Sequence, residues 1–475
     1  MSRGEVPQRV AVVGGGAAGL AAAYELRREL GPQAHITLVE QTDRLGGKLR
    51  TVRLAGREFD LGAEAFLVRR PEVLRLAEEL GVDDGIVYPG SASATVRAGG
   101  RTRPLPGGTV MGVPSSPEAV QDVLSEAGVA AVRAEADLPP LELGGADVSV
   151  GRLLRERVGD EVVDRLVEPL LGGVYAGNAD LLGLRATIPA LAAAIDAGAQ
   201  SVTAAAAAAL PAPSEPGRKP PVFGAFANGY QRLVDELVRE CAAEVRLGLP
   251  VRAVERSGTG WRLEIGSAPT PDVLEADAVV LAVPAPAARR LLSGVVPEAA
   301  DRMAGVDVAS MVVVGLALPP ETPLPDASGV LIARGETHAD GTPFTAKAFT
   351  FSSRKWPHLR GENGELLVRG SVGRFGETEE LRLTDEELLR RVRADLSELI
   401  GAAVDPVDTA VLRWGGGLPQ YGVGHLDAIS GIERAVGEVP GLAVAGAALH
   451  GLGVPACVAT GQAAAAKVTR DLVAA

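Results

Sequence analysis

Residues 9–19 read RVAVVGGGAAG, and this stretch decides the fold of the chain. Residues 10–13 form a continuous apolar run, which is typical of a strand that is covered on both faces of a parallel sheet. Glycines follow at once, and Ala17–Leu30 is rich in alanine and leucine, so the order predicts a strand, a tight turn and a helix. Residues 35–40 form a second predicted strand. The chain therefore opens with a βαβ unit.

The glycines of this turn form a G-x-G-x-x-G pattern between the predicted strand and helix. Gly14 permits the tight turn, Gly16 lets the backbone approach a pyrophosphate, and Gly19 allows close helix–strand packing. The helix N-terminus offers free N–H groups to the phosphates. Glu40 ends the second strand, where a carboxylate accepts hydrogen bonds from a ribose diol. The predicted dinucleotide contacts are Gly14, Gly15, Gly16, Ala17, Ala18, Gly19, Glu40 and Gln41.

Composition sets wider limits on the function. The chain has 475 residues, and single cores stop growing beyond roughly 250–300 residues, so at least two domains are expected. The net charge is −13 and no block of Lys and Arg occurs, which argues against a nucleic-acid-binding protein. Cys241 and Cys457 are isolated, which predicts neither a disulfide framework nor a zinc site.

The ends of the chain and its apolar stretches bear on its location. The N-terminus does not have the pattern of a signal peptide, because its apolar run leads directly into glycines. No stretch of about 18–20 strongly apolar residues occurs, so we expect no transmembrane segment and at most peripheral membrane contact. Together with the cysteine content, this predicts a cytoplasmic protein.

Parallel-type strands recur around 278–283 and 442–445, far from the first ones. Since a sheet of this kind needs five or six strands, the nucleotide-binding domain is expected to be discontinuous. We predict an α/β protein with three parts: a discontinuous Rossmann-like nucleotide-binding domain (1–90, 224–290 and 405–475), an α+β substrate-binding domain (91–110 and 291–404), and a helical subdomain (111–223) that ends in a Pro-rich linker (211–221).

Several single elements can be predicted as well. Residues 71–80 and 230–241 have helical periodicity, and residues 245–254 are interpreted as one strand. The final helix is expected to begin at Gly461, after a glycine-rich loop. These boundaries can be compared directly with the structure.

Residues 43–48, DRLGGK, follow the acidic residue at once. This stretch resembles the R-x-G-G-[RK] motif of flavoproteins of the amine oxidase, phytoene desaturase and protoporphyrinogen oxidase type. Residues 59–64, FDLGAE, are similar to the second flavin-contact loop of that group. The resemblance implies FAD as the cofactor rather than NAD. The FAD contacts that it implies here are Arg44, Gly47, Lys48, Gly62, Ala63 and Glu64.

A longer match narrows the resemblance to the porphyrinogen oxidases. Residues 168–177, EPLLGGVYAG, are similar to a signature that lies against the substrate pocket in that family. Residues 352–357, SSRKWP, match a strand of its substrate domain, and 445–461 resembles its closing flavin loop and final helix. The further FAD contacts implied by the resemblance are Val251, Trp414, Gly446, Gly453, Val454 and Pro455.

The resemblance also implies the reaction. Residues 347–374 look more like the coproporphyrinogen III type of Gram-positive bacteria than the protoporphyrinogen IX type. The implied activity is the six-electron, O₂-dependent oxidation of coproporphyrinogen III in haem biosynthesis, with release of H₂O₂ and with the chemistry carried by FAD. The alternatives are a protoporphyrinogen IX oxidase, a flavin amine oxidase or desaturase, and a non-catalytic carrier of flavin or tetrapyrrole. Contact with other haem-pathway enzymes stays open.

Substrate contacts follow from the anionic propionates, which require Arg or Lys in a net-acidic protein. The family's Arg ahead of the hairpin turn is replaced here by Ser93, Ala94 and Thr95. The basic candidates are Arg69, Arg70, Arg101, Arg103, Arg354 and Lys355. The resemblance adds Gly173, Val174, Tyr175 and Phe351 as substrate-facing residues. The five histidines suggest neither a metal cluster nor a catalytic triad, and no protein residue is predicted to be catalytic by itself.

Overall fold

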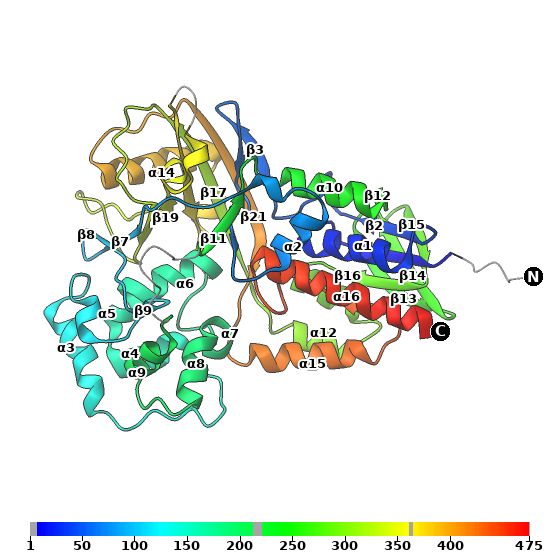
Figure 1. The fold of residues 1–475 in the computed structure, drawn as a ribbon, viewed down its shortest axis with the longest axis horizontal. Coiled ribbons are helices and arrows are strands. Elements are labelled where there is room, and N and C mark those ends of the chain that lie inside the picture. Colours follow the sequence, from blue (N-terminus) through cyan, green and yellow to red (C-terminus); the bar gives the residue numbers. More distant parts are fainter. Residues whose placement is uncertain (1–6, 212–220, 361–363, 475) are drawn as a thin grey trace, which may run out of the picture.

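The computed structural model describes residues 7–211, 221–360 and 364–474. Figure 1 shows a parallel sheet with its helices on the right, a second and larger sheet at the upper left, and a group of helices at the lower left. The first and last described elements, β1 and α16, both lie at the parallel sheet. Among the helices of the described ranges, none is long and apolar enough to cross a bilayer.

The first sheet has five parallel strands in the order β12-β2-β1-β16-β22. Val10 pairs with Ile36 on one side and with Ala278 on the other, so strands from distant parts of the chain meet at β1. The bounds of these strands are β1 (Arg9–Val13), β2 (His35–Val39), β12 (Glu244–Arg246), β16 (Ala278–Leu281) and β22 (Leu442–Val444).

Helices cover both faces of this sheet, which explains the continuous apolar run of β1. Val10 and Val12 belong to the core beneath α1 (Ala17–Leu30), whereas Ala11 and Val13 belong to the core on the other face. The first face is covered by α1, α2 (Glu72–Glu79), α10 (Gln231–Cys241) and α16 (Val454–Ala474). The second is covered by α11 (Ala285–Leu292), α12 (Pro297–Met303), α15 (His425–Gly437) and the antiparallel strands β13 (Val251–Ser257), β14 (Gly260–Gly266) and β15 (Pro271–Ala276).

The second sheet has seven strands in the order β21-β17-β20-β19-β18-β7-β8. Valines and leucines on one face of its central strands form a core with α14 (Asp385–Ile400). The opposite face looks toward α6 and the loops of the first sheet (Figure 1). The bounds are β7 (Ala94–Ala98), β8 (Arg101–Pro104), β17 (Val308–Leu318), β18 (Gly329–Ile332), β19 (Ala346–Thr350), β20 (Leu366–Val372) and β21 (Asp408–Pro419).

The helical part has its own core of valine, leucine and isoleucine side chains. Its helices are α3 (Glu126–Ala134), α4 (Val150–Val158), α5 (Asp160–Val162), α6 (Glu168–Tyr175), α7 (Leu184–Thr187), α8 (Pro189–Asp196) and α9 (Val202–Ala209), with a π-helical turn at Val163–Val167. Most of the predicted Pro-rich linker lies outside the described residues.

Short elements connect these parts. A three-stranded sheet joins the two larger bodies, and two hairpins extend from the connecting loops. These elements are β3 (Thr51–Leu54), β4 (Arg57–Asp60), β5 (Phe66–Leu67), β6 (Ile86–Val87), β9 (Thr109–Val110), β10 (Val113–Pro114), β11 (Phe223–Phe226) and α13 (Ser352–Lys355).

The predicted α/β fold class is confirmed, and the division into domains at the residues given above stays a prediction. Three element predictions were wrong. Residues 245–254 form two strands in different sheets, because the chain leaves the parallel sheet after β12. Residues 352–357 begin with the short helix α13, in which the Lys355 amide bonds to the Phe351 carbonyl. The last helix begins at Val454, seven residues before the predicted start.

Candidate active site

The site begins at the turn between β1 and α1. The Gly14 amide donates to the carbonyl of Val39, and the Gly15 amide donates to Glu40 Oε2 at 2.8 Å. Gly16 is the N-cap of α1, and among the described residues no side chain caps the first amides of this 14-residue helix. Such a helix end presents free N–H groups and partial positive charge. The turn therefore has the donors that a pyrophosphate requires.

A second glycine loop lies directly against this turn. The Gly46 amide donates to the Gly15 carbonyl at 2.8 Å. A Cβ on Gly16 would meet only the Cα of Gly47, at 3.9 Å, whereas a Cβ on Gly47 would come within 2.9 Å of the Gly16 Cα. The two backbones thus form a narrow cradle that any side chain would fill. Its shape fits two linked phosphates.

Glu40 is buried at the end of β2, where both of its carboxylate oxygens are bound. Oε2 accepts from Gly15, and Oε1 accepts from the amide and the hydroxyl of Thr42, each at 2.9 Å. Each carboxylate oxygen has two lone pairs, so capacity remains for a ribose hydroxyl. Glu40 therefore also holds the glycine turn in place, a role that the sequence did not suggest.

The two basic residues of the second motif have different surroundings. The Arg44 guanidinium donates to the carbonyls of Leu45 and Gly47, so it braces the glycine loop. The Lys48 ammonium is buried, and burial lowers its pKa. A Cβ on Gly417 of β21 would lie 3.7 Å from Lys48 Cε. The Lys48 side chain therefore extends toward β21.

The loop at residues 60–64 runs along residues 48–50. The Ala63 amide donates to the Lys48 carbonyl at 2.9 Å. Arg369, from β20, donates to the Gly62 carbonyl at 2.8 Å, and Trp414 Nε1, from β21, donates to the Leu61 carbonyl at 3.3 Å. Two strands of the seven-stranded sheet therefore hold this loop beside residues 48–50. Arg369 was not among the residues predicted from the sequence. The alternation of side chains along β20 does place it on the face opposite Val368 and Val372, which pack against α14.

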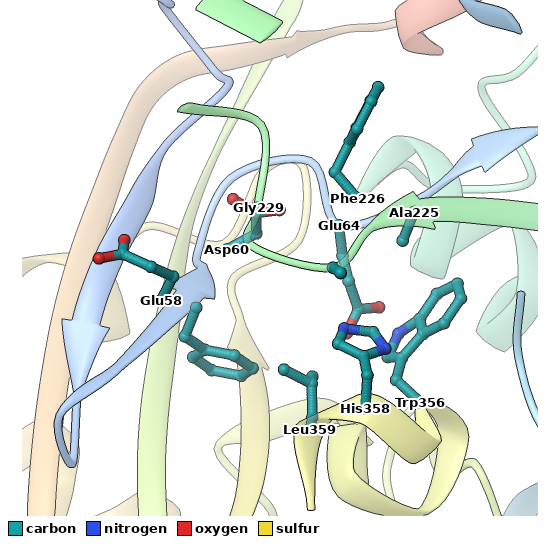
Figure 2. A pocket seen from close by; sticks show the side chains of 11 residues that line it. Glu58, Asp60, Glu64, Ala225, Phe226, Gly229, Trp356, His358 and Leu359 are labelled. Carbon is teal, nitrogen blue, oxygen red and sulfur yellow. The ribbon is translucent and has the colours of Figure 1, made fainter. Parts of the chain in front are cut away.

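Glu64 points from this loop toward α13 (Figure 2). Its carboxylate accepts from Lys355 Nζ at 2.9 Å and from Ser352 Oγ at 3.0 Å. Burial alone would raise the pKa of Glu64, but the charges of Lys355 and Arg369 outweigh it and hold the pKa at about 2. Lys355, predicted as a substrate contact, thus has a carboxylate partner within the protein.

A cavity of about 20 Å³ lies beside Glu64 and is lined by Asp60, Trp356 and His358, among others (Figure 2). Burial raises the pKa of Asp60 to about 6, although Oδ1 accepts from the Thr51 hydroxyl at 2.6 Å. Trp356 Nε1 and His358 Nδ1 are buried and have no hydrogen-bond partner within residues 7–211, 221–360 and 364–474. A polar cavity of this size fits about one water molecule.

The C-terminal segment closes over the turn. The Gly446 amide donates to Thr460 Oγ1 at 3.0 Å, and the Tyr421 hydroxyl donates to the Ala447 carbonyl at 2.6 Å. Val454 and Pro455 are buried in the first turn of α16, directly after Gly453. At the other end of the site, the Val251 carbonyl accepts from Arg290 at 3.2 Å.

The predicted substrate residues do not all converge. Gly173 and Val174 of α6 are exposed, and Tyr175 is 8% exposed with its ring against Tyr421. Phe351 is 1% exposed and packs in the core that faces α14, which removes it from the substrate contacts.

The predicted basic residues are scattered as well. Arg101 and Arg103 are exposed on β8, the edge strand farthest from β17 and β21. Arg69 is exposed, and Arg70 pairs with Glu72. Arg354 donates to the Leu324 carbonyl. The substrate contacts expected of these residues stay predictions.

Comparison with known proteins agrees with this geometry. The model of the family described as flavin containing amine oxidoreductase matches residues 17–469. The chain belongs to this family. Membership confirms the prediction of a flavoprotein oxidoreductase with FAD as its cofactor.

Individual relatives are similar over their whole length. Coproporphyrinogen III oxidase of Mycobacterium tuberculosis is 45% identical, with 98% of each chain covered. The Bacillus subtilis protein of the same name is 31% identical, with 96% of this chain and 97% of the relative covered. Among solved structures, a putative protoporphyrinogen oxidase from Exiguobacterium sp. 255-15 matches with a TM-score of 0.84 and 30% identity, covering 98% of this chain and 99% of the other.

Proposed function

We propose that this protein oxidises coproporphyrinogen III to coproporphyrin III, with O₂ as the electron acceptor. The observation that supports this most strongly is the 45% identity to a coproporphyrinogen III oxidase over 98% of both chains. The exposed Gly173 and Val174 of α6, and the 60–64 loop that strands β20 and β21 hold in place, offer a place for a large flat substrate beside the cofactor.

The chain's own residues bind and orient the cofactor. We assign the pyrophosphate to the amides of the α1 N-terminus and to the Gly16–Gly47 cradle, and the adenosine ribose to Glu40. The ring system is assigned to the space bordered by the 60–64 loop, Trp414 and the residues that precede α16. FAD, when bound, supplies two-electron acceptance, so a six-electron oxidation requires three rounds.

Each round removes a hydride from a carbon of the macrocycle together with one proton. Over three rounds the substrate loses six hydrogens, four from its meso carbons and two from its nitrogens, because the porphyrin keeps two N–H groups. The protein contributes orientation, and its buried groups keep water away from the reacting face. Arg369, which fixes the Gly62 carbonyl, and the Lys355–Glu64 pair are assigned as positioning residues for the 60–64 loop. No side chain is assigned as a nucleophile.

The test is side-by-side turnover of coproporphyrinogen III and protoporphyrinogen IX by the purified yellow protein. We expect porphyrin fluorescence to appear faster from coproporphyrinogen III, with three molecules of H₂O₂ formed for each porphyrin. Faster turnover of protoporphyrinogen IX would support the second candidate, which the name of the Exiguobacterium structure favours. Peroxide from simple amines without any porphyrin would refute both.

The cellular setting is part of the same proposal. We place the reaction in the cytoplasm, because two unpaired cysteines and a net charge of −13 suit a reducing aqueous compartment. The reactive tetrapyrrole product would pass from this protein to the enzyme that consumes it. Fractionation of cells that produce the tagged protein checks its location.

A further inference from the structure

The second sheet carries a row of residues that runs from the flavin loop toward α6. Val313 pairs with Ser371, Ser371 with Ala348, and Ala348 with Leu331, across four neighbouring strands. Paired residues share a face, and this one is opposite the core under α14. At the far end, a Cβ on Gly173 would lie 3.5 Å from Leu331 Cδ2. The row is therefore one wall of the space proposed for the substrate.

Lys347 lies in this wall, at a bulge. The register of β19 and β20 shifts between Ala346 and Ala348, so Lys347 is the extra residue. A bulge re-aims a side chain, and α6 packs against both β18 and β19 here. Lys347 is 4% exposed, and its Nζ has no hydrogen-bond partner in the part of the chain that the structure describes. A buried ammonium without a partner is costly unless an anion accompanies it.

The charged groups around Lys347 leave an excess of positive charge. Arg374 and Glu377 face it from the segment after β20, and Glu168 faces it from α6. Glu377 is already bound by Arg334 at 2.5 Å and lies 3.9 Å from Arg374. On the opposite face of β19, Asp395 of α14 accepts hydrogen bonds from the amides of Thr345 and Ala346.

Glu168 does not neutralise this excess. Its Oε2 accepts from the Ala179 amide at 2.6 Å, while Oε1 has no partner within the described ranges. Burial raises the pKa of Glu168, which favours its neutral form. Lys347, Arg334 and Arg374 are thus three basic side chains around one carboxylate, Glu377, which is already paired, in a protein whose net charge is −13.

We propose that Lys347, with Arg374 beside it, forms a carboxylate-binding site at the α6 end of this wall and receives a propionate of the substrate. The inference rests on the proposed function and names the groups that recognise its substrate. The flexible four-carbon stem lets the ammonium move toward an anion that seats against α6. Coproporphyrinogen III carries propionates where protoporphyrinogen IX carries vinyl groups, so this site discriminates between the two.

Protonation provides a signature of the contact. Burial lowers the pKa of Lys347 to about 7, and the Arg374 charge acts in the same direction. A carboxylate beside the ammonium favours its charged form, so the pKa rises when the ligand binds. At pH 8, binding is therefore accompanied by proton uptake at Lys347.

The first experiment compares Lys347→Met with Lys467→Met. Methionine keeps the length and apolar stem but removes the charge, and Lys467 is a control because it pairs with Asp471 in α16. We expect Lys347→Met to raise the ratio of KM for coproporphyrinogen III to KM for protoporphyrinogen IX by about tenfold, as loss of one charge-assisted hydrogen bond implies. The control leaves this ratio at the wild-type value.

The second experiment requires no turnover. Coproporphyrin III, the product, is bound to the holoprotein at pH 8 in two buffers of different ionisation enthalpy, and the difference in heat gives the protons taken up. We expect wild type to take up close to one proton more than Lys347→Met or Lys347→Gln. Two variants are used so that a folding defect in one does not decide the result.

The outcomes separate the two proposals. Equal KM ratios and equal proton uptake in wild type and both variants would overturn the carboxylate site while leaving the proposed function intact. A wild-type holoprotein that neither binds coproporphyrin III nor oxidises either porphyrinogen would overturn the proposed function, and this inference with it.

Discussion

Single residues decide whether the cofactor site can form, and Gly16 is the most critical of them. Its Cβ position opens onto the cradle with Gly47, so any side chain would stand where the phosphate oxygens are proposed to lie. We predict that Gly16→Val abolishes flavin binding, measured as loss of the absorbance near 450 nm after purification. Gly294→Val is the matched control, because a Cβ there has nothing within 4 Å. Retained yellow colour in Gly16→Val would remove the phosphates from this turn.

Asp60 gives a prediction about pH. Its folded-state pKa of about 6 is above the ordinary 3.8, so the folded protein binds the proton more tightly, and stability falls as pH rises from about 4 to 6. Asp60→Asn removes this cost while its amide oxygen still accepts from Thr51. We expect the variant to gain roughly 1–3 kcal/mol at pH 7 and nothing below pH 4. Denaturant unfolding at both pH values is the measurement, and a variant less stable than wild type at pH 7 would contradict it.

Sequence reasoning was strong at residues whose backbone is constrained and weak at residues whose partners are distant. Gly14, Gly16 and Gly19 could be placed because local geometry demands them. The pairing of Lys355 with Glu64, across nearly 300 positions, could not be predicted, since nothing local marks either residue as a partner of the other. Only the packed fold brings them together.

Among the elements, the contact between α1 and α16 determines how the nucleotide site is closed. A Cβ on Gly461 would lie 2.2 Å from the Ala18 carbonyl oxygen, so the two helices touch backbone to backbone. We predict that Gly461→Leu costs more than about 3 kcal/mol and weakens FAD binding, because overpacking forces α16 away from the turn. Ala463→Leu, at an exposed position of the same helix, is the control. Equal melting temperatures for the two variants would refute the contact.

The bounds of an element could be predicted where a periodic apolar pattern ended at a helix-terminating residue. They were missed where glycines interrupted the pattern. Ala17–Leu30 was predicted with both ends correct, since Gly31 follows it. The long strand β21 was not predicted, because Gly415, Gly416 and Gly417 interrupt its pattern and only pairing with β17 keeps it extended. Residues 352–355 form the short helix α13, whereas the family resemblance implied a strand over 352–357.

At the scale of the whole molecule, the cofactor site combines segments that are far apart in the chain. The parallel sheet combines the adjacent strands of residues 9–13 and 35–39 with strands of residues 244–246, 278–281 and 442–444. The glycine turn follows β1 of this sheet, and Trp414 and Arg369 of the second sheet bind the carbonyls of Leu61 and Gly62 in the loop beside residues 48–50. Folding of the separate parts and binding of FAD should therefore be coupled.

This coupling gives a prediction that separates the two halves of the cofactor. FAD added to the flavin-free protein should raise the unfolding free energy by about 2.7 kcal/mol at a hundredfold excess over Kd. FMN should stabilise far less at the same concentration, because it lacks the second phosphate and the adenosine that the α1 N-terminus and Glu40 are proposed to hold. Thermal unfolding with each ligand is the measurement, and Gly16→Val should lose most of the FAD effect. Equal stabilisation by FMN and FAD would place the binding energy in the isoalloxazine region and contradict a pyrophosphate cradle at Gly16 and Gly47.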